Sequence, residues 1–542
     1  MHAIPQDQLT AALVHRGLLE ANELEKLKRE ARKRRVDLLN LIMARFRLPM
    51  TAVYRAMAEM KGVPFVDFTR QQPNLEIAKT FPISLIKRGV ALPIAIEQNV
   101  LSVACTNTDD HLLLAEIERR TSLHPKAMLA EPAALTDACA ELLGQLDPNS
   151  RVIEDEDPVV ILDRVMKEAF LRRASDIHFD PQPDSMLIRL RIEGRLQNLP
   201  IPLSERQSHA LVSRVKVLSG LDIAEQRAAQ DGGMTYHLTS LPDTSIDLRV
   251  ATIATKWGER VTIRLLAQES KEFTLNETGM TETALKTFRR AIRNPYGMVL
   301  ITGPTGSGKS TTLYAALREI RRPEVNVMTL EDPVESNVRG ISQIQVDSAD
   351  KITFAKGLRS LLRHDPDVIM VGEIRDYETA EVALRSAMTG HLMFSTLHTN
   401  DAPSAVTRLK DIGCEPYLIA STLLLVVAQR LVRKLCGNCK ISRPPTPNER
   451  TYLGLTDPDA QICAPSKEGC SRCVGTGFQG RIGVFELLEI DQELQRIIAD
   501  QASQKEWQEA IATRRTALRE DAFHKVLKGE TTLEEVLGVT VA

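Results

Sequence analysis

The spacing of apolar residues changes several times along the chain, and each spacing predicts a different kind of element. In the first 60 residues, apolar side chains recur every three or four positions over 9–27 and again over 38–57, which predicts two helical stretches. Seven of the ten residues at 26–35 are Lys or Arg. We expect a solvated helix face there, with a docking patch for acidic partners or lipid head groups as the alternative.

After residue 63, short β-branched runs alternate with amphipathic stretches, a pattern typical of α/β domains. A first small α/β unit is predicted to extend to about residue 145, with a strand at 100–105 and a closing helix over 136–144. An acidic, proline-containing linker at 146–158 separates it from a second unit. The elements predicted for that second unit are a helix at 159–174 and strands at 186–197, 246–254 and 259–266.

The most apolar long segment of the chain is residues 418–432. Ser421, Thr422, Gln429 and Arg430 interrupt it before it reaches the roughly 20 residues of a membrane span. We therefore predict a buried helix at this position.

Composition narrows the classes of protein that the chain could belong to. A length of 542 residues predicts about three or four domains. The 69 Lys and Arg nearly balance the 71 Asp and Glu, and the net charge of -2 argues against bulk electrostatic capture by nucleic acid or membranes. No basic segment followed by an apolar one begins the chain, so we expect no secretory signal and a cytoplasmic protein. Eight cysteines then favour thiols or metal ligands over disulfides.

A glycine-rich loop follows the strand predicted at 297–302, and a helical pattern follows the loop. The loop matches the phosphate-binding motif G-x-x-x-x-G-K-[ST] in its strand–loop–helix context, which disfavours a chance turn. Lys309 is expected to bridge the β- and γ-phosphates, and Ser310 to reach Mg²⁺. The residues predicted to bind ATP are Gly303, Pro304, Thr305, Gly306, Ser307, Gly308, Lys309, Ser310 and Thr311.

Three later strands end in side chains that could complete this site. The strand at 325–330 leads into Glu331 and Glu335, a second strand ends at Glu373, and a third ends at His398. Because the carboxyl ends of parallel strands meet at one edge of a sheet, we expect these side chains to converge beside the phosphate loop. One acid would hold the magnesium shell and another would take a proton from water. An acidic turn held by Pro333, and a structural role for His398, are the alternatives.

Two CxxC pairs near the carboxyl end predict a metal site. Cys436 and Cys439 form the first pair, and Cys470 and Cys473 the second. Four thiolates from two tight turns form a closed tetrahedral zinc site, so the zinc is expected to be structural. Cys463 lies close by and could compete as a ligand, although a buried free thiol is the simpler interpretation for it. Cys105, Cys139 and Cys414 are likewise expected to be buried free thiols.

With these motifs in place, the chain resembles the secretion ATPases that drive type II secretion and type IV pilus assembly. The segments that carry the resemblance are GPTGSGKSTT at 303–312, TLEDPVE at 329–335, LLRHDPDVIMVGEIRDYETAE at 361–381 and TGHLMFSTLHTNDA at 389–402. They are similar to the family's Walker A, Asp box, Walker B and His box, in the same order. A Gly-Glu ending of Walker B is typical of the family, which implies that Glu373 holds the metal shell. Glu331 or Glu335 is left as the water-activating base.

The resemblance also covers segments upstream and downstream of this core. The segments ASDIHFDP at 174–181, LDIAEQRAAQDGG at 221–233 and DLRVATIATKWGERVTIRLL at 247–266 are similar to the family's second N-terminal domain. The resemblance implies that Arg249 and Arg264 reach the phosphates when that domain closes on the ATPase domain. Gly233 departs from the family's usual arginine, and Ala228-Ala229 stands where a proline is common. TGFQGRIG at 476–483 is similar to the sequence that follows the four-cysteine element in assembly members.

The first 150 residues resemble the family only loosely. Some members bind a cyclic dinucleotide there through paired Arg-Leu-Gly motifs, and the corresponding positions here are Gln8-Leu9-Thr10 and Val36-Asp37-Leu38. We therefore expect no binding of cyclic-di-GMP by this domain.

The resemblance implies a multidomain α/β fold with four parts. They are an N-terminal helical and α/β domain over 1–148, a PAS-like second domain over 149–270, a RecA-like P-loop ATPase core over 271–432, and a helical C-terminal region with the zinc element over 433–542.

The implied function is that of a cytoplasmic hexameric ATPase, peripherally associated with the inner membrane. It would power assembly of a type IV pilus or a type II secretion pseudopilus through an inner-membrane platform protein, with ATP, Mg²⁺ and Zn²⁺ as cofactors and no nucleic-acid partner. A DNA-translocating or conjugative RecA-like ATPase is the alternative, disfavoured by the near-zero net charge and the lack of a basic, aromatic-interleaved groove. The intact acids disfavour a scaffold that binds nucleotide without hydrolysing it. A retraction motor is disfavoured because such members lack the long N-terminal region and the four cysteines.

Overall fold

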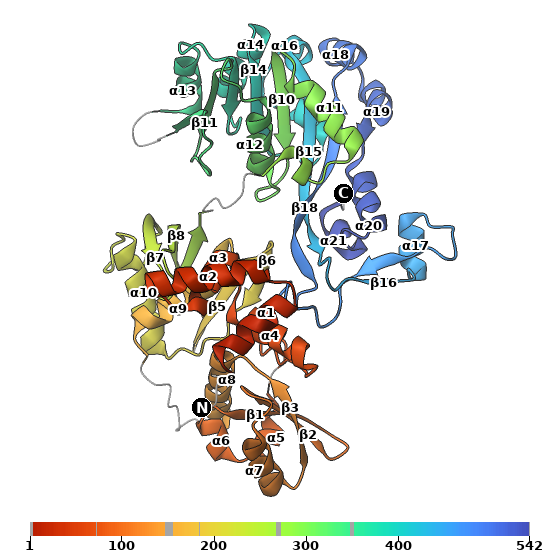
Figure 1. Cartoon of the computed structure of the whole chain (residues 1–542). Helices are drawn as coiled ribbons and strands as arrows, with labels where there is room; N and C mark the ends of the chain where they lie inside the picture. Colours follow the sequence, from red (N-terminus) through yellow and green to blue (C-terminus); the bar gives the residue numbers. More distant parts are fainter. Residues whose placement is uncertain are drawn as a thin grey trace. The chain divides into compact units, whose positions relative to one another are not determined.

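The chain folds into two compact units (Figure 1). Unit 1 comprises residues 1–268 together with 467–477, and unit 2 comprises 269–466 together with 478–542. The computed structural model describes residues 4–71, 73–146, 156–183, 185–266, 273–346 and 352–540. Residues 147–155 of the linker predicted at 146–158 lie outside these residues.

Four helices begin unit 1, where the sequence predicted two helical stretches. They are α1 (Gln6–His15), α2 (Ala21–Arg34), α3 (Leu38–Phe46) and α4 (Met50–Lys61). Gly17 has a φ of +63° and breaks the first stretch, while Arg47 in the left-handed region and Pro49 at the start of α4 break the second. Most cations of the basic segment lie on α2 and are exposed, which fits both a solvated helix face and a docking patch.

A small α/β layer follows, with a core of its own. Its sheet has the order β1-β2-β3, built from β1 (Ala91–Glu97), β2 (Val100–Cys105) and β3 (His124–Leu129). The predicted strand at 100–105 and the closing helix, α8 (Pro132–Leu146), are both confirmed. The other helices are α5 (Leu75–Thr80), α6 (Ile83–Lys87) and α7 (His111–Thr121).

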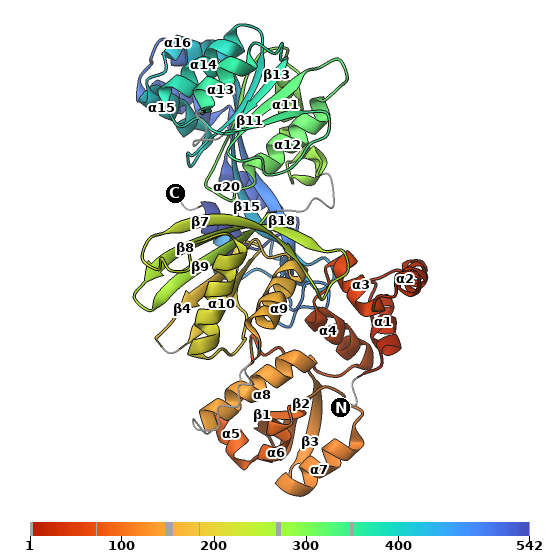
Figure 2. The same cartoon turned by 90° about the vertical axis from the view of Figure 1, so that its left-hand side faces the viewer.

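The remainder of unit 1 is a six-stranded antiparallel sheet in the order β6-β5-β4-β9-β8-β7. Helices α9 (Pro158–Leu171) and α10 (Glu205–Leu218) cover one face of it (Figure 2). The strands are β4 (Asp176–Pro181), β5 (Met186–Ile192), β6 (Arg195–Asn198), β7 (Gln230–His237), β8 (Ser245–Thr255) and β9 (Gly258–Leu265). The single strand predicted at 186–197 is instead a hairpin, because Glu193 and Gly194 adopt positive φ and turn the chain.

Unit 2 is built on an eight-stranded sheet in the order β12-β11-β13-β14-β10-β15-β18-β19. The first six strands are parallel, and β18 and β19 run antiparallel. Strands β10, β11, β13 and β14 are buried along their whole length, which explains their nearly continuous apolar sequences. The strand bounds are β10 (Gly297–Thr302), β11 (Val327–Glu331), β12 (Ser342–Gln345), β13 (Val368–Val371), β14 (Leu392–Leu397), β15 (Leu423–Leu435), β18 (Phe478–Glu489) and β19 (Arg515–Thr516).

The prediction of a buried helix over 418–432 is wrong. Helix α16 (Pro416–Thr422) ends at Thr422, and the rest of the segment is β15, paired with β10 on one side and β18 on the other. A strand buried on both faces and a buried helix have the same uninterrupted apolar pattern, so periodicity could not separate them. Among the described residues, no helix is long and apolar enough to cross a membrane.

Unit 2 also contains helices and a small two-stranded sheet that pairs β16 (Ile441–Arg443) with β17 (Ile462–Ala464). The helices are η2 (Leu275–Glu277), α11 (Glu282–Ile292), α12 (Lys309–Ile320), α13 (Phe354–Leu361), α14 (Tyr377–Met388), α15 (Ala402–Ile412), α17 (Pro447–Leu453), α18 (Gln492–Ala499), α19 (Gln504–Ala512), α20 (Leu518–Leu527) and α21 (Leu533–Thr540).

Candidate active site

The phosphate loop joins the end of β10 to the start of α12, as the motif predicts. Gly303, Gly306 and Gly308 have φ values of +148°, +80° and +86°, a backbone conformation that side chains with a Cβ rarely adopt. Space is also limiting, because a Cβ on Gly303 would lie 2.4 Å from the carbonyl oxygen of Gln429. The glycines are therefore required by the backbone path, which ends at a helix N-terminus suited to phosphate.

Lys309 lies over this loop. Its Nζ donates to the carbonyl oxygens of Gly303 and Pro304 at 2.8 and 3.2 Å. Burial lowers the pKa of Lys309, while the carboxylates of Glu373 and Glu335 act in the opposite direction. Both acids therefore act electrostatically on the lysine of the loop.

Glu373 and His398 are brought together at the ends of neighbouring parallel strands. Glu373 lies two residues beyond β13, His398 directly follows β14, and the two strands pair in register. His398 Nε2 lies 3.3 Å from Glu373 Oε2, and Arg375 forms an ion pair with the same carboxylate. The side chain of Glu373 is 14% exposed, whereas that of His398 is 51% exposed. The predicted meeting of these two strand ends is confirmed.

The two acids that the sequence could not rank have different surroundings. Glu331 ends β11 and is only 4% exposed. Its carboxylate accepts hydrogen bonds from Tyr314, from Thr329 Oγ1 at 2.6 Å and from Gln343 Nε2 at 3.0 Å. Burial, and next the hydrogen bond with Glu331, raise the pKa of Tyr314. Glu335 is exposed, so its carboxylate can reach a ligand without breaking such a network.

Two polar residues of β15, Gln429 and Arg430, also belong to the site and were missed by the sequence reasoning. Gln429 Nε2 donates to the carbonyl oxygen of Ser307 at 2.9 Å, and its Oε1 accepts from Thr312 Oγ1 at 2.9 Å. Arg430 donates to the carbonyl oxygen of Asn400 at 2.7 Å, and burial lowers its pKa. Two polar residues inside an apolar run were the available signal. Their contact with the loop appears only when the segment is placed as a strand beside β10.

Arg249 and Arg264 lie in unit 1 and face each other across β8 and β9. Arg264 also pairs with Asp176 across β4 and β9, and its Nε lies 3.0 Å from Asp176 Oδ1. Asp176 is buried, whereas the side chain of Arg264 remains 62% exposed. The sheet thus holds one of the two predicted arginines by its Nε while the remainder of its guanidinium faces solvent. Arg249 is exposed as well.

The four cysteines of the two CxxC pairs cluster. Their sulfurs all lie within 4.8 Å of one another. Among the described residues, this cluster consists of these four cysteines, and Cys463 is not part of it. Cys470 Sγ and Cys473 Sγ are 3.8 Å apart, close to the ~3.8 Å expected between two thiolates that share one tetrahedral zinc. The backbone N–H groups of Cys470 and Gly477 donate to Cys473 Sγ at 3.1 and 3.2 Å, an arrangement that would stabilise a thiolate. This donor set fits zinc. Cys105, Cys139 and Cys414 are buried free thiols, as predicted.

A mostly parallel sheet with a phosphate loop after a buried strand, and acids at neighbouring strand ends, defines a P-loop ATPase. Residues 153–538 match the family model described as type II/IV secretion system protein. The chain therefore belongs to this family, whose named members are ATPases. A second model, the MshEN domain, matches residues 62–149.

Individual relatives agree with the family. The chain is 39% identical over 508 residues to the type II secretion system protein E of Aeromonas hydrophila, covering 92% of this chain and 99% of that protein. It is 38% identical over 517 residues to the type IV pilus assembly ATPase PilB of Thermus thermophilus, covering 90% of this chain and 57% of the relative. Among solved structures, the ATPase DotB of Legionella pneumophila aligns with a TM-score of 0.52 at 23% identity, over 71% of this chain and 98% of DotB, which is a likeness of fold.

Proposed function

We propose that the chain is a cytoplasmic ATPase motor, peripherally associated with the inner membrane, that acts as a homohexamer on an inner-membrane platform protein. ATP hydrolysis would power the assembly of a secretion pseudopilus or a type IV pilus. The observation that carries this proposal is the phosphate loop beside the Glu373–His398 pair, in a chain whose relatives are named for both machines. The proposal keeps the expectation that neither nucleic acid nor cyclic-di-GMP is a ligand.

The roles of the loop residues follow from their positions. Lys309 would contact the β- and γ-phosphates, and the loop residues Gly303 to Thr311 would surround them through backbone N–H groups. Ser310, at the first turn of α12, and Glu373 would hold Mg²⁺, Glu373 partly through water. Magnesium, when bound, neutralises charge that develops on the phosphates. His398, in contact with Glu373, would respond to the γ-phosphate or its loss.

For the general base we favour Glu335 over Glu331. Three side chains already donate to the Glu331 carboxylate, which is buried, so moving it toward water would leave these donors unpaired. Glu335 is exposed and acts on Lys309 electrostatically. An exposed carboxylate beside the phosphate loop can accept a proton from an attacking water.

Charge neutralisation from outside the loop is assigned to Arg249 and Arg264. When the second domain closes on the ATPase domain, these arginines would approach the γ-phosphate and supply positive charge conditionally. The anchoring of Arg264 Nε by Asp176 supports this role, because a guanidinium held at one edge loses less freedom on binding phosphate.

The domain boundaries predicted from the sequence form part of the proposal. We assign a PAS-like fold to 149–270 and a RecA-like fold to 271–432, preceded by the N-terminal domain at 1–148 and followed by the zinc-bearing region at 433–542. Zinc would be held by Cys436, Cys439, Cys470 and Cys473. When bound, it supplies folding free energy and takes no part in hydrolysis.

The direct test is ATP hydrolysis by purified Lys309→Ala and Glu373→Ala variants. Both are expected to lose hydrolysis, while Lys286→Ala, which removes an exposed lysine of α11, retains it. Normal turnover by either site variant would overturn the assignment.

A strain from which the gene is deleted shows whether the protein serves pilus assembly or type II secretion. The strain is complemented with the wild type or with Lys309→Ala, and surface pili and secreted proteins are measured side by side. Loss of pili with normal secretion indicates a pilus motor. Retained pili with secreted enzymes trapped in the periplasm indicate a type II secretion motor.

A further inference from the structure

The second CxxC pair lies in a loop that packs with the amino-terminal half of the chain. We call residues Lys467–Gly477 the thiol loop. It belongs to unit 1, although the residues before and after it in sequence belong to unit 2. It contains neither helix nor strand, so its shape depends on turns and on the thiols of Cys470 and Cys473.

Glu59 of α4 receives the centre of the thiol loop. Its Oε1 accepts from the backbone N–H of Ser471 at 2.7 Å, and its Oε2 accepts from Ser471 Oγ at 3.1 Å. Arg16, at the end of α1, pairs with the same carboxylate at 2.6 Å. Ser471 is 1% exposed and lies between the two cysteines of the pair. The carboxylate of Glu59 can therefore make both hydrogen bonds only when the turn between Cys470 and Cys473 has this backbone conformation.

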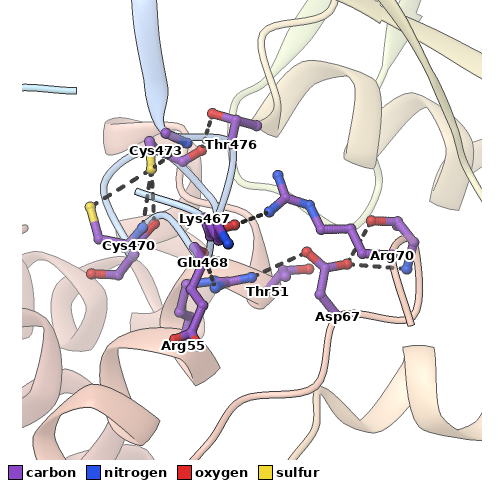
Figure 3. Close-up of polar contacts among 12 residues, drawn as sticks. Thr51, Arg55, Asp67, Arg70, Lys467, Glu468, Cys470, Cys473 and Thr476 are labelled. Atoms are coloured by element: carbon purple, nitrogen blue, oxygen red, sulfur yellow. Dashed lines mark hydrogen bonds and ion pairs between the residues drawn. The ribbon is translucent and has the colours of Figure 1, made fainter. Parts of the chain in front are cut away.

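Arg55, one helical turn before Glu59, holds the amino-terminal side of the loop. Its Nη1 donates to the carbonyl oxygen of Glu468 at 2.9 Å, and its Nη2 donates to Asp67 Oδ2 at 3.1 Å. Figure 3 shows Arg55 between these two partners. The guanidinium also lies over the ring of Phe65, 4.7 Å from its centroid, and the residue is 7% exposed. A buried arginine with these partners is part of a built contact, since a buried charge without them is costly.

The fit is tight at two further points. A Cβ on Gly475 would lie 2.5 Å from Arg55 Nη2, so the loop approaches the arginine as closely as a glycine allows. Arg472 donates to the carbonyl oxygen of Gly17 at 2.8 Å, just after α1. Arg70 and the carbonyl oxygen of Lys467 make a weaker contact at 3.5 Å (Figure 3). We call the residues that contact the thiol loop, together with the side chains that hold them, the cradle: Arg16, Gly17, Arg55, Glu59, Asp67 and Arg70.

We propose that the thiol loop is a metal-dependent docking element that holds helices α1 and α4. The contacts at Ser471 and Glu468 are made by backbone groups, so they require one loop conformation rather than a particular loop sequence. A metal bound by Cys470 and Cys473 fixes that conformation, since no helix or strand within the loop does so. Loss of the metal releases the loop from the cradle and frees α1 and α4. The cradle thus makes the position of the amino-terminal helices sensitive to the bound metal.

Amide hydrogen exchange of the full-length protein, loaded with one zinc per chain or stripped with a chelator, tests this inference. Stripping is expected to raise exchange at least tenfold in peptides covering α1, α4 and the thiol loop, while α10 and strands β10 to β14 keep their protection. Unchanged exchange in α1 and α4 after zinc loss would overturn the proposal. A uniform rise that includes β10 to β14 would also overturn it, because it would show general unfolding. The readout does not depend on ATP hydrolysis or on the machine that the protein serves.

Two variants separate docking from metal binding. Glu59→Gln and Arg472→Ala are both expected to raise exchange in α1, in α4 and in the thiol loop while zinc content stays at one per chain. Arg472 is exposed, so its replacement leaves the fold intact. Glu23→Gln on α2 is the matched control, because Glu23 lies outside the cradle, and it is expected to change nothing. Wild-type exchange in both cradle variants would show that these contacts do not hold the helices.

Discussion

At the scale of single residues, the site distinguishes acids that the sequence left equivalent. Glu331 and Glu335 occur in one short acidic segment, and either could have been the base. The structure buries the first in a hydrogen-bond network with Tyr314, Thr329 and Gln343 and leaves the second exposed. This difference in burial, which depends on how β11 pairs within the sheet, is the reason why we propose Glu335 as the base.

Paired substitutions test this distinction. Glu335→Gln is expected to lower kcat by about 10²–10⁴-fold with little change in thermal stability, because it removes only the proton acceptor. Glu331→Gln is expected to destabilise the fold by about 1–3 kcal/mol while kcat falls less than tenfold, because it disturbs a buried network. Steady-state hydrolysis and thermal unfolding of both variants give the answer. The reverse pattern would make Glu331 the base.

At the scale of elements, β15 decides more of the site than its sequence suggested. Pairing with β10 places Gln429 against the phosphate loop, where it contacts Ser307 and Thr312. A helix over the same residues would have pointed these polar groups elsewhere. The loop is thus supported from a neighbouring strand as well as by its own glycines.

Gln429→Leu tests the support that β15 gives to the loop. The change leaves the Thr312 hydroxyl without its acceptor and the Ser307 carbonyl without its donor in a buried setting, each costing about 1–3 kcal/mol. We expect a lower melting temperature and weaker binding of ATP, measured by calorimetry. Gln492→Leu, at the exposed start of α18, is the control and should change neither. Unaltered ATP affinity would show that the loop needs no support from β15.

The four-cysteine element is a second case in which one small structure depends on distant residues. Cys436→Ser is expected to lower bound zinc to well under one per chain and to reduce the melting temperature, because a structural metal contributes folding free energy. Cys463→Ser, outside the cluster, should retain zinc and stability. Zinc content from atomic absorption, together with thermal unfolding, measures both effects. Full zinc loading of Cys436→Ser would exclude that thiol as a ligand.

At the scale of the whole molecule, catalysis is proposed to depend on the closure of one domain on another. Arg264→Ala is expected to lower kcat by about 10³-fold, since an arginine supplied to the γ-phosphate contributes that much or more. Asp176→Asn should give a smaller loss, because the guanidinium remains but is held less firmly. Arg119→Ala, an exposed arginine of α7, is the control. Steady-state kinetics give kcat and KM separately for each variant. A wild-type kcat in Arg264→Ala would show that this arginine takes no part in the mechanism.

The sequence by itself determined the features that are local in the chain. The phosphate loop, the strands that lead into Glu373 and His398, the helices α8 and α9 and the two CxxC pairs were all predictable, because each depends on residues close together in sequence. The predictions of single elements were wrong where a turn residue interrupts a predicted helix or strand. Gly17 and Pro49 divided the two helical stretches, and Glu193-Gly194 divided one predicted strand.

The tertiary structure decided everything that depends on which segments become neighbours. A fully apolar pattern fits a buried strand and a buried helix equally well, so only the pairing of β15 with β10 showed that Gln429 supports the phosphate loop. The same holds for the burial of Glu331, for the anchoring of Arg264 by Asp176, and for the contact of Glu59 with a loop 412 positions away in sequence. Burial and long-range hydrogen bonds are properties of the packed chain, and no local pattern of residues encodes them.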